Sequence, residues 1–509
     1  MRAACWTCRK RTIQCDRTSD PCAKCKKAGL ECFETRPLRW VKGVAIRGKL
    51  RGRVLEEDQK VANGKPTMPP KQKSVLSSVA KSLALKSAPP LALQDPCTDD
   101  LGWSSRFYLD YYNIRIAKLF ILYDSASNPF RNLLAYAVDD STLRMGIIAV
   151  AARHFANSGR SFDQTDDASS PQVVNANVDA LHFKRQAIKS LLSSLSHPTP
   201  SQKDTIMATI LLLIFLDILE SGIDGWKYHL HGAEELFKIS QSMLEPGTSH
   251  HVNSDPGETV EETRRFVARQ FSLVSTIGGA LSNSESMPGL CVNSEEGRNQ
   301  ESIIRSFLGC PGFLLEAIRY FSNQRHVIET LKMYDDTSIQ EHVRDTQTML
   351  ELTGEFDCVE WASNSVQSNK SPIVKVHMLS LLSESYRTAT FLYGNRVLRA
   401  FGKSAGAVAS DNGKLVLRLL DVIEALKCDD ALFKCLLWPT FIAGLECETE
   451  SDQQQVVQSL KTLWDLTCCL NIINASKILH DHWRQKQSGG NLTPEESQLY
   501  VIEQGWLLV

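Results

Sequence analysis

The sequence predicts a mainly α-helical protein in three parts: a small N-terminal cysteine module, a flexible linker and a large all-α domain. Six of the 15 cysteines lie between residues 5 and 32. Residues 54–100 are rich in proline, serine and lysine, which is typical of a linker. From residue 101 onward apolar residues recur at helical spacing and strand-like alternation is scarce, so we expect helix after helix over 101–509.

The cysteine-rich stretch is an internal repeat with a period of 17 residues. Each half has the spacing C-x2-C-x6-C, with basic residues directly after the second cysteine. A C-x2-C turn can place two sulfurs on one metal, and a spacer of six residues can return a third. Zinc takes four ligands, so six sulfurs satisfy two zincs when two of them bridge. The spacing therefore predicts two zinc ions held by Cys5, Cys8, Cys15, Cys22, Cys25 and Cys32.

Two other uses of these thiols fit less well. Three disulfides would suit an oxidising compartment, but no apolar signal segment precedes the cysteines, so we expect a reducing one. A thioredoxin-like dithiol needs a strand beside its C-x-x-C, and no strand pattern occurs here. Metal binding also supplies the folding free energy that so short a module lacks. The other nine cysteines are scattered, and we expect them to be small core residues.

The charge is divided unevenly along the chain. Residues 1–53 hold 15 Lys/Arg and 4 Asp/Glu, a net charge of +11, whereas the remainder holds 42 and 54, a net charge of −12. This asymmetry is typical of a basic nucleic-acid or membrane arm on an acidic body. The longest apolar run, residues 206–219, contains Asp217 and is too short to cross a bilayer. We expect a buried helix there and no membrane contact.

The doubled spacing, with the loop "DRTSDPC" and its Pro21, resembles the fungal binuclear zinc cluster family of transcription factors. The resemblance implies a nuclear protein that binds double-stranded DNA, with pairing of two copies and contacts to transcription machinery or co-regulators as further expectations. It also implies that the first small helix enters the major groove at a CGG-like triplet. By the same resemblance Cys5 and Cys22 bridge, Cys8 and Cys15 complete one zinc, and Cys25 and Cys32 complete the other.

The stretch "CRKRTIQC" departs from the family's basic pattern, which is similar to C-R-x-R-K-x-K-C. Arg9 and Arg11 match, whereas Thr12 and Gln14 stand where lysines are usual. Arg prefers guanine, Gln prefers adenine and Thr is permissive, so one hypothesis is a CGG-related half-site relaxed at one position. The alternative is that Arg11 and backbone carbonyls contact the bases and Thr12 leaves space. We expect a helix over residues 9–14, with base contacts from Arg9, Arg11, Thr12 and Gln14.

Residues 33–53 form a basic extension of the cysteine module. Residues 36–53 carry seven Lys/Arg and no acid, which fits phosphate contact and nuclear import, or simply a solvated tail. We expect phosphate contacts from Lys10, Arg17, Lys24, Lys26, Lys27, Arg36, Arg39 and Lys42. In the linker, "KSVLSSVAKSLALK" suits one short amphipathic helix, too short to predict a coiled coil.

The large domain is similar to the second type of fungal-specific transcription factor domain. The similarity rests on "DSASNPFRNLLAYAVDDSTLRMGIIAVAARHFA", "GWKYHLHGAEELF" and "WPTFIAGLE" and implies an all-helical regulatory body. Asn128-Pro129 is typical of a helix start, and Ser141 is the expected N-cap of a helix over 141–156. We expect packing or capping roles for Trp226, His229 and His231.

The sequence contains no P-loop, G-x-S-x-G, H-E-x-x-H or strand-linked G-x-G-x-x-G, which argues against an enzyme. "HDH", 480–482, is expected to be surface histidines, because residues two apart on a helix face differently. "LTPEESQLYVIEQGWLLV" fits an activation peptide or, better, a docked last helix. We predict a sequence-specific regulator of RNA polymerase II transcription, for a pathway or gene cluster. The alternatives are a basic zinc scaffold without sequence preference and an unrecognised zinc or thiol enzyme.

Overall fold

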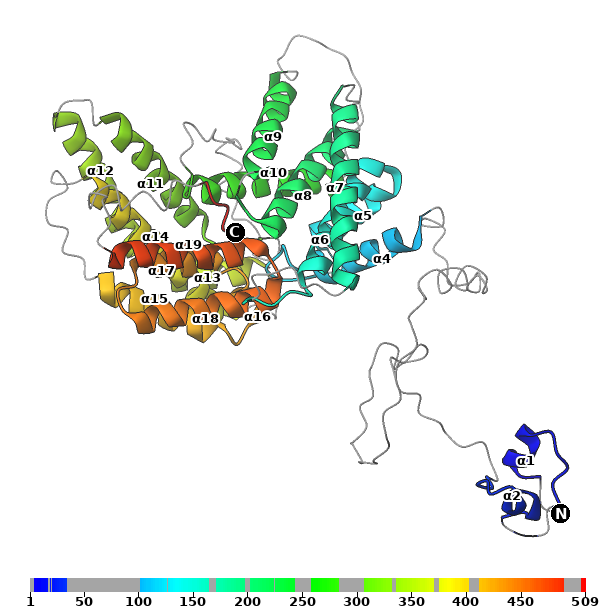
Figure 1. Ribbon diagram of the computed structural model, residues 1–509. Helices are drawn as coiled ribbons and strands as arrows, with labels where there is room; N and C mark the ends of the chain where they lie inside the picture. The colour runs from blue at the N-terminus through cyan, green and yellow to red at the C-terminus, as the bar shows by residue number, and fades with distance from the viewer. Residues whose placement is uncertain are drawn as a thin grey trace. The chain divides into compact units, whose positions relative to one another are not determined.

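The computed structural model divides the chain into two units, Met1–Ala88 and Pro89–Val509 (Figure 1). Every regular element among the described residues is a helix, which confirms the mainly α prediction. The linker 54–100 and the helix expected within it lie outside the described residues. The structure describes residues 4–16, 19, 21–33, 101–125, 127–163, 171–196, 202–223, 225–242, 258–282, 306–331, 336–369, 375–401, 412–488 and 505–509.

The first unit holds two five-residue helices, α1 (Trp6–Lys10) and α2 (Ala23–Lys27). Each begins directly after the first cysteine of one C-x2-C pair, and Cys5 and Cys22 are the respective N-cap residues. The two helices contact each other through the cysteines, and this cluster of sulfurs is the only hydrophobic cluster among the described residues of the unit. The module therefore has no ordinary apolar core.

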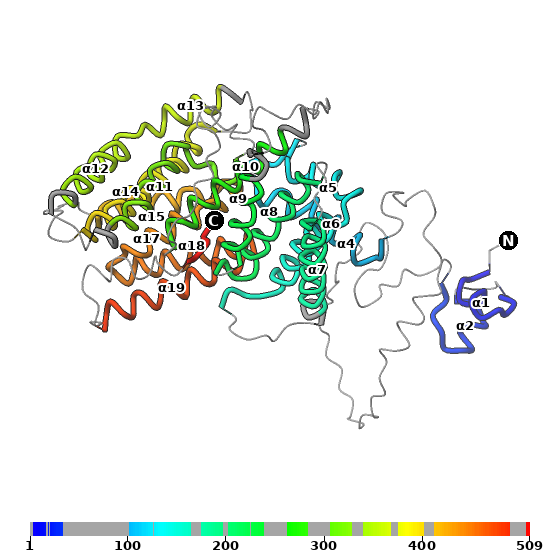
Figure 2. The backbone as a smooth tube through the Cα atoms, turned by 90° about the horizontal axis from the view of Figure 1, so that it is seen from above, coloured from blue at the N-terminus to red at the C-terminus, as the bar shows by residue number. Residues whose placement is uncertain are grey.

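The first half of the body is arranged around α6, which packs against α7, α8, α4 and α5 (Figures 1 and 2). The apolar run 206–219 lies in α8, where nearly every side chain is buried, as the sequence predicted. The elements are α4 (Trp103–Tyr111), the π-helix η3 (Tyr112–Ile116), α5 (Pro129–Asp139), α6 (Ser141–Asn157), α7 (Pro171–Ser196), α8 (Lys203–Glu220), α9 (Gly225–Ser242) and α10 (Glu258–Gly279).

The second half is arranged around α14, which contacts α11, α12, α13, α15 and α17. Buried side chains of both halves belong to one continuous hydrophobic cluster. None of the described helices is long and apolar enough to cross a membrane. The elements are α11 (Gly312–Leu331), α12 (Asp336–Glu355), α13 (Cys358–Asn369), α14 (Val376–Ala400), α15 (Asn412–Leu426), α16 (Asp430–Phe433), α17 (Leu437–Glu446), α18 (Glu450–Thr467) and α19 (Leu470–Gln487).

Two expected helix starts have different outcomes. Asn128 caps α5 by accepting a hydrogen bond from the Phe130 N–H at 2.9 Å, with Pro129 in the first turn, as predicted. The prediction that Ser141 caps α6 is wrong. Asp140 is the cap, because its carboxylate accepts from both the Thr142 and Leu143 N–H groups, at 2.8 and 3.0 Å. A carboxylate at this position also interacts favourably with the positive end of the helix dipole.

The histidine and cysteine expectations need correction at two positions. His482 is not a surface residue: it is buried, and its Nε2 lies 3.3 Å from the Leu445 carbonyl because α19 packs against α17. Cys428 is exposed rather than a core residue, at the turn after α15. Cys358, Cys435, Cys447, Cys468 and Cys469 are buried as expected, and Cys310 is partly buried. Cys97 and Cys291 lie outside the described residues.

A buried ion network joins α14, α15 and α17. Glu446 accepts hydrogen bonds from Arg396 and Arg399, both at 2.7 Å, and from Asn412 at 3.1 Å. Burial alone would raise the pKa of Glu446, but the two guanidinium groups outweigh it and hold the pKa at about 2. Glu446 is therefore ionised at neutral pH and fixes the relative positions of these helices.

Candidate metal centre and nucleic-acid interface

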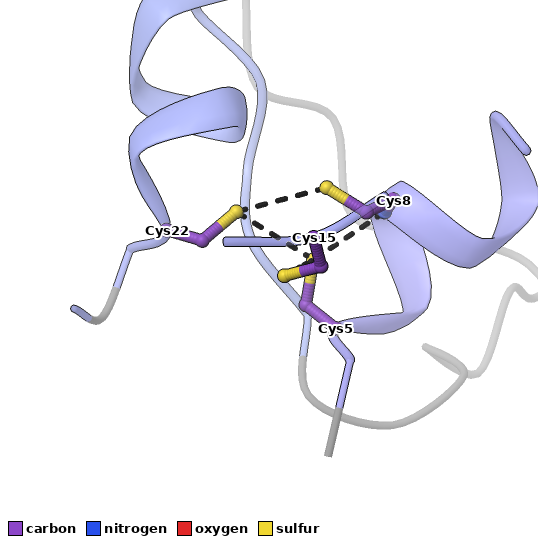
Figure 3. A group of neighbouring side chains, drawn as sticks. All are labelled: Cys5, Cys8, Cys15 and Cys22. Carbon is purple, nitrogen blue, oxygen red and sulfur yellow. Dashed lines mark hydrogen bonds between the residues drawn. The ribbon is translucent and has the colours of Figure 1, made fainter. Parts of the chain in front are cut away.

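Six sulfur atoms gather at the centre of the N-terminal unit. Cys5, Cys8, Cys22 and Cys25 are buried, whereas Cys15 and Cys32 are partly exposed. Two sets of four sulfurs lie within 4.8 Å of one another, and Cys5 and Cys22 belong to both sets. Cys8 and Cys15 complete the first set, which Figure 3 shows pointing toward one another, and Cys25 and Cys32 complete the second.

The sulfur–sulfur distances fit tetrahedral zinc. A Zn–S bond of about 2.3 Å places neighbouring sulfurs of a tetrahedron about 3.8 Å apart, whereas a disulfide is about 2.0 Å long. The Cys5 sulfur lies 3.8 Å from those of Cys22 and Cys25 and 3.9 Å from that of Cys15, and Cys8 lies 3.7 Å from Cys22. Cys8 and Cys25, which belong to different sets, are also 3.8 Å apart. The donor set and its spacing suit two zincs that share two sulfurs.

The two halves position their sulfurs in the same way. The Cys5 sulfur accepts the Cys8 N–H at 3.3 Å, and the Cys22 sulfur accepts the Cys25 N–H at 3.4 Å. The hydrogen bond from the Cys25 N–H lowers the pKa of Cys22, against the opposing effect of burial. This favours the thiolate, the form that binds metal. The N-cap position thus both orients each shared sulfur and stabilises its charged form.

Both helices end with a left-handed residue, which corrects the expected helix over residues 9–14. Helix α1 stops at Lys10, Arg11 is its C-cap, and Thr12 has φ 53°. The equivalent residue after α2 is Gly29, with φ 62°. A left-handed residue cannot continue a right-handed helix, so Gln14 lies in the segment that returns to Cys15. Glycine adopts this conformation freely, whereas threonine is strained in it.

Hydrogen bonds close the module around the sulfurs. The Thr7 hydroxyl donates to the Glu31 carbonyl at 2.8 Å and accepts from the Phe33 N–H at 3.2 Å. The Trp6 N–H donates to the Phe33 carbonyl at 2.6 Å. Sequence analysis did not identify Thr7. In the 17-residue repeat Thr7 aligns with Lys24, a residue of a different type. This mismatch was the only indication in the sequence that Thr7 has a role that the second half does not repeat.

The cationic side chains of the module lie on its surface. Arg9, Lys10 and Arg11 are exposed on and just after α1, together with Thr12 and Gln14. Lys10 also lies over the Trp6 ring, with its Nζ 5.2 Å from the ring centroid. On α2 the exposed cations are Lys24, Lys26 and Lys27. Arg17, Arg36, Arg39 and Lys42, the other expected phosphate contacts, lie outside the described residues.

Comparison with known families agrees with this geometry. Residues 3–41 match the Fungal Zn(2)-Cys(6) binuclear cluster domain, and residues 107–507 match the Fungal specific transcription factor domain. The chain belongs to this family of fungal transcription factors. It is therefore a DNA-binding transcription regulator with two zinc ions as its cofactor. Both matched families are transcription-factor domains and neither is an enzyme family.

One curated relative is the acriflavine sensitivity control protein acr-2 of Neurospora crassa, which is 21% identical over 410 residues. The alignment covers 78% of this chain and 65% of the relative, so the chain spans less than two thirds of that protein. No solved structure matches the chain significantly.

Proposed function

We propose that the zinc module contacts the bases of a CGG-related half-site with the residues at the end of α1. The observation that supports this is an asymmetry between two halves of equal geometry. Where the first half has Arg11 and Gln14, the second has Ala28 and Glu31. Arg and Gln are the side chains that pair with purine edges, whereas a carboxylate such as Glu31 is repelled by the phosphate backbone. The end of α1 is thus the better base-contacting edge.

The proposed base contacts differ in the bases that they can recognise. Arg9 and Arg11 are exposed and can each place a fork of donors on guanine O6 and N7. Gln14, in the segment after the helix, prefers adenine. The Thr12 hydroxyl donates to the Arg11 carbonyl at 2.7 Å. While this bond is made the hydroxyl can accept from a base but cannot donate to one, so Thr12 is proposed as the weakest of the four determinants.

The remaining cations position the module on DNA without selecting a sequence. Lys10, Lys24, Lys26 and Lys27 are exposed on both small helices and suit contacts with phosphates. The same role is proposed for Arg17, Arg36, Arg39 and Lys42. The proposed zinc ligands are all six cysteines, with Cys5 and Cys22 bridging, since these two belong to both sets of four.

The helical body is proposed to regulate the activity of the DNA-bound protein in the nucleus, without catalysis of its own. The family to which residues 107–507 belong supports this role. Pairing of two copies on two half-sites and contacts with transcription machinery or co-regulators are part of the same proposal. The name of the Neurospora relative refers to control of acriflavine sensitivity, and we extend to this chain only a role as a pathway or gene-cluster regulator.

Selection from random DNA with the intact zinc-loaded chain tests the proposal. The wild type should enrich a CGG-related half-site, with one position relaxed. Arg11→Ala should lose sequence preference more than total affinity, because the other cations still hold phosphates. Lys24→Ala is the matched control, which should weaken binding to all sequences about equally. If no motif is enriched, the result favours a zinc scaffold without sequence preference. If the wild type selects only CGG, and Thr12→Lys selects the same sequence, then Thr12 does not affect base preference.

A further inference from the structure

Residues Gly505–Val509, called the docked segment below, insert into the centre of the body. Leu507 and Leu508 are almost completely buried, with exposed fractions of 0% and 1%, and both belong to the main hydrophobic cluster. Figures 1 and 2 show the segment in red between the green helices α8–α10 and the orange-red α19. The segment is docked, as expected, but it is not helical. The helix start expected at residues 493–496 lies outside the described residues.

The body binds the backbone of the docked segment. The Gly505 and Trp506 N–H groups both donate to the Leu281 carbonyl, just beyond α10, at 2.8 and 3.1 Å. The Leu507 N–H donates to the Gly222 carbonyl, in the turn after α8, at 2.7 Å. Recognition through main-chain groups, with apolar side chains in pockets, is how proteins bind extended peptides.

Two buried side chains complete the contact from opposite sides. Trp226 of α9 donates its indole N–H to the Gly505 carbonyl at 3.2 Å. Asn471 of α19 donates its side-chain amide to the Leu507 carbonyl at 3.2 Å. Both side chains have an exposed fraction of 0%. The docked segment therefore connects α19 to the turn after α8, to α9 and to the end of α10.

Glycines leave the room that the docked segment and Trp226 occupy. Gly222 has φ 71°, and a Cβ added there would lie 2.8 Å from the Leu507 carbonyl oxygen and from the Asn471 Cβ. A Cβ on Gly278 of α10 would lie 2.3 Å from the Trp226 ring. Because any side chain at these positions would collide with its neighbours, the space is shaped for this occupant.

We propose that Gly222, Trp226, Leu281 and Asn471 form a peptide-binding groove, and that the docked segment is its exchangeable ligand in cis. The ligand class is a short extended peptide with the pattern Gly-Trp-Leu-Leu-Val. Most of its hydrogen bonds come from backbone groups, so another apolar peptide of this pattern can take its place. The segment joins α19 to the α8–α10 helices, and α19 also contacts the end of α8 directly through Asn474, which donates to the Ser221 carbonyl. Release of the segment therefore removes one of the links between them. The groove is thus a point at which the regulatory body can be loosened, independently of how the zinc module binds DNA.

Peptide binding to a shortened chain tests the proposal. A chain that ends at Gln504 is titrated against a fluorescein-labelled synthetic peptide of residues 503–509, and binding is followed by fluorescence anisotropy. The shortened chain should bind the peptide with a Kd of about micromolar order, and the full chain at least about tenfold more weakly, because its own segment competes at high effective concentration. A peptide with Leu507→Asp should not bind. Asn471→Ala in the shortened chain should weaken binding.

The shortened chain can lose its fold, so a second measurement uses the full chain. A protease site is placed at the Gly489-Gly490 pair, and the chain is cut only after folding. Exchange of the cut fragment for labelled peptide, with helix content retained, supports the proposal. A folded shortened chain that does not bind the peptide, or a cut fragment that never exchanges, would show that residues 505–509 are a fixed part of the core. A dimer in which each copy binds the docked segment of the other would also contradict the proposal, because the segment would then not bind within its own chain.

Discussion

Replacing Thr12 with glycine should stabilise the zinc module. Thr12 is β-branched and has φ 53°, a conformation that costs a non-glycine residue about 1–2 kcal/mol. Glycine gives back about 0.5–1 kcal/mol of this through the greater freedom of the unfolded chain. Thr12→Gly also removes the hydrogen bond from the Thr12 hydroxyl to the Arg11 carbonyl, but this bond is exposed to solvent, so its loss offsets little of the gain. The expected net gain in the free energy of unfolding is about 0.5–1 kcal/mol.

Zinc affinity is the appropriate assay, because a small zinc module folds as it binds metal. A gain of this size should raise the apparent zinc affinity of Thr12→Gly roughly two- to fivefold in competition with a chelator. The matched control is Gly29→Thr in the other half, where φ is 62° and a Cβ meets no atom within 4 Å. It introduces strain alone, so affinity should fall by a similar factor. If Thr12→Gly weakens zinc binding, or Gly29→Thr has no effect, the argument from strain is wrong.

Three further predictions concern the body and the basic extension. Glu446→Gln should cost about 3 kcal/mol in urea unfolding at pH 7, because it removes the carboxylate that the buried Arg396 and the partly exposed Arg399 share. The wild-type contribution is present above the unfolded pKa and should be lost as pH falls toward the folded pKa of about 2. Asn128→Ala should cost about 1–2 kcal/mol, since the side chain caps α5 and also donates to the Ala117 carbonyl and the Asp124 carboxylate. Asn128→Asp keeps the capping oxygen but sets a buried carboxylate against these two acceptors, so it should also be destabilising. Deleting residues 36–53 should flatten the dependence of log affinity on log salt by about 0.9 for each phosphate that these residues neutralise, and an unchanged slope would mean that this stretch does not touch DNA.

The elements that sequence pattern predicted well are those set by local chemistry. The C-x2-C-x6-C repeat indicated two equivalent halves, and the structure brings all six sulfurs together. Proline after Asn128 indicated the start of α5 because proline is compatible with a first helical turn. The run 206–219 has apolar residues all around the helix, with Asp217 as its one charged residue, which predicts burial on every side, and this is what α8 shows.

Other features depend on packing that no local pattern encodes. His482 is buried because α19 lies against α17, and nothing near residue 482 in the sequence indicates that contact. The docked segment forms hydrogen bonds with Gly222, Trp226 and Leu281, more than 200 residues away in the sequence. The end of α1 at Lys10 was predictable in principle, because the repeat aligns Thr12 with Gly29, a residue typical of helix ends. The expectation of one continuous helix over residues 9–14 came instead from the resemblance to the zinc cluster family, which the repeat did not correct.

The central claim, that the six N-terminal cysteines hold two zincs with two shared sulfurs, is tested most directly by native mass spectrometry of the intact chain. Two zincs per chain are expected for the wild type. Cys22→Ser should reduce the occupancy of both, because Cys22 belongs to both sets of four sulfurs, whereas Cys8→Ser should mainly weaken one. One zinc or none in the wild type would contradict the two-zinc module, and equal losses in the two variants would contradict the bridging role of Cys22.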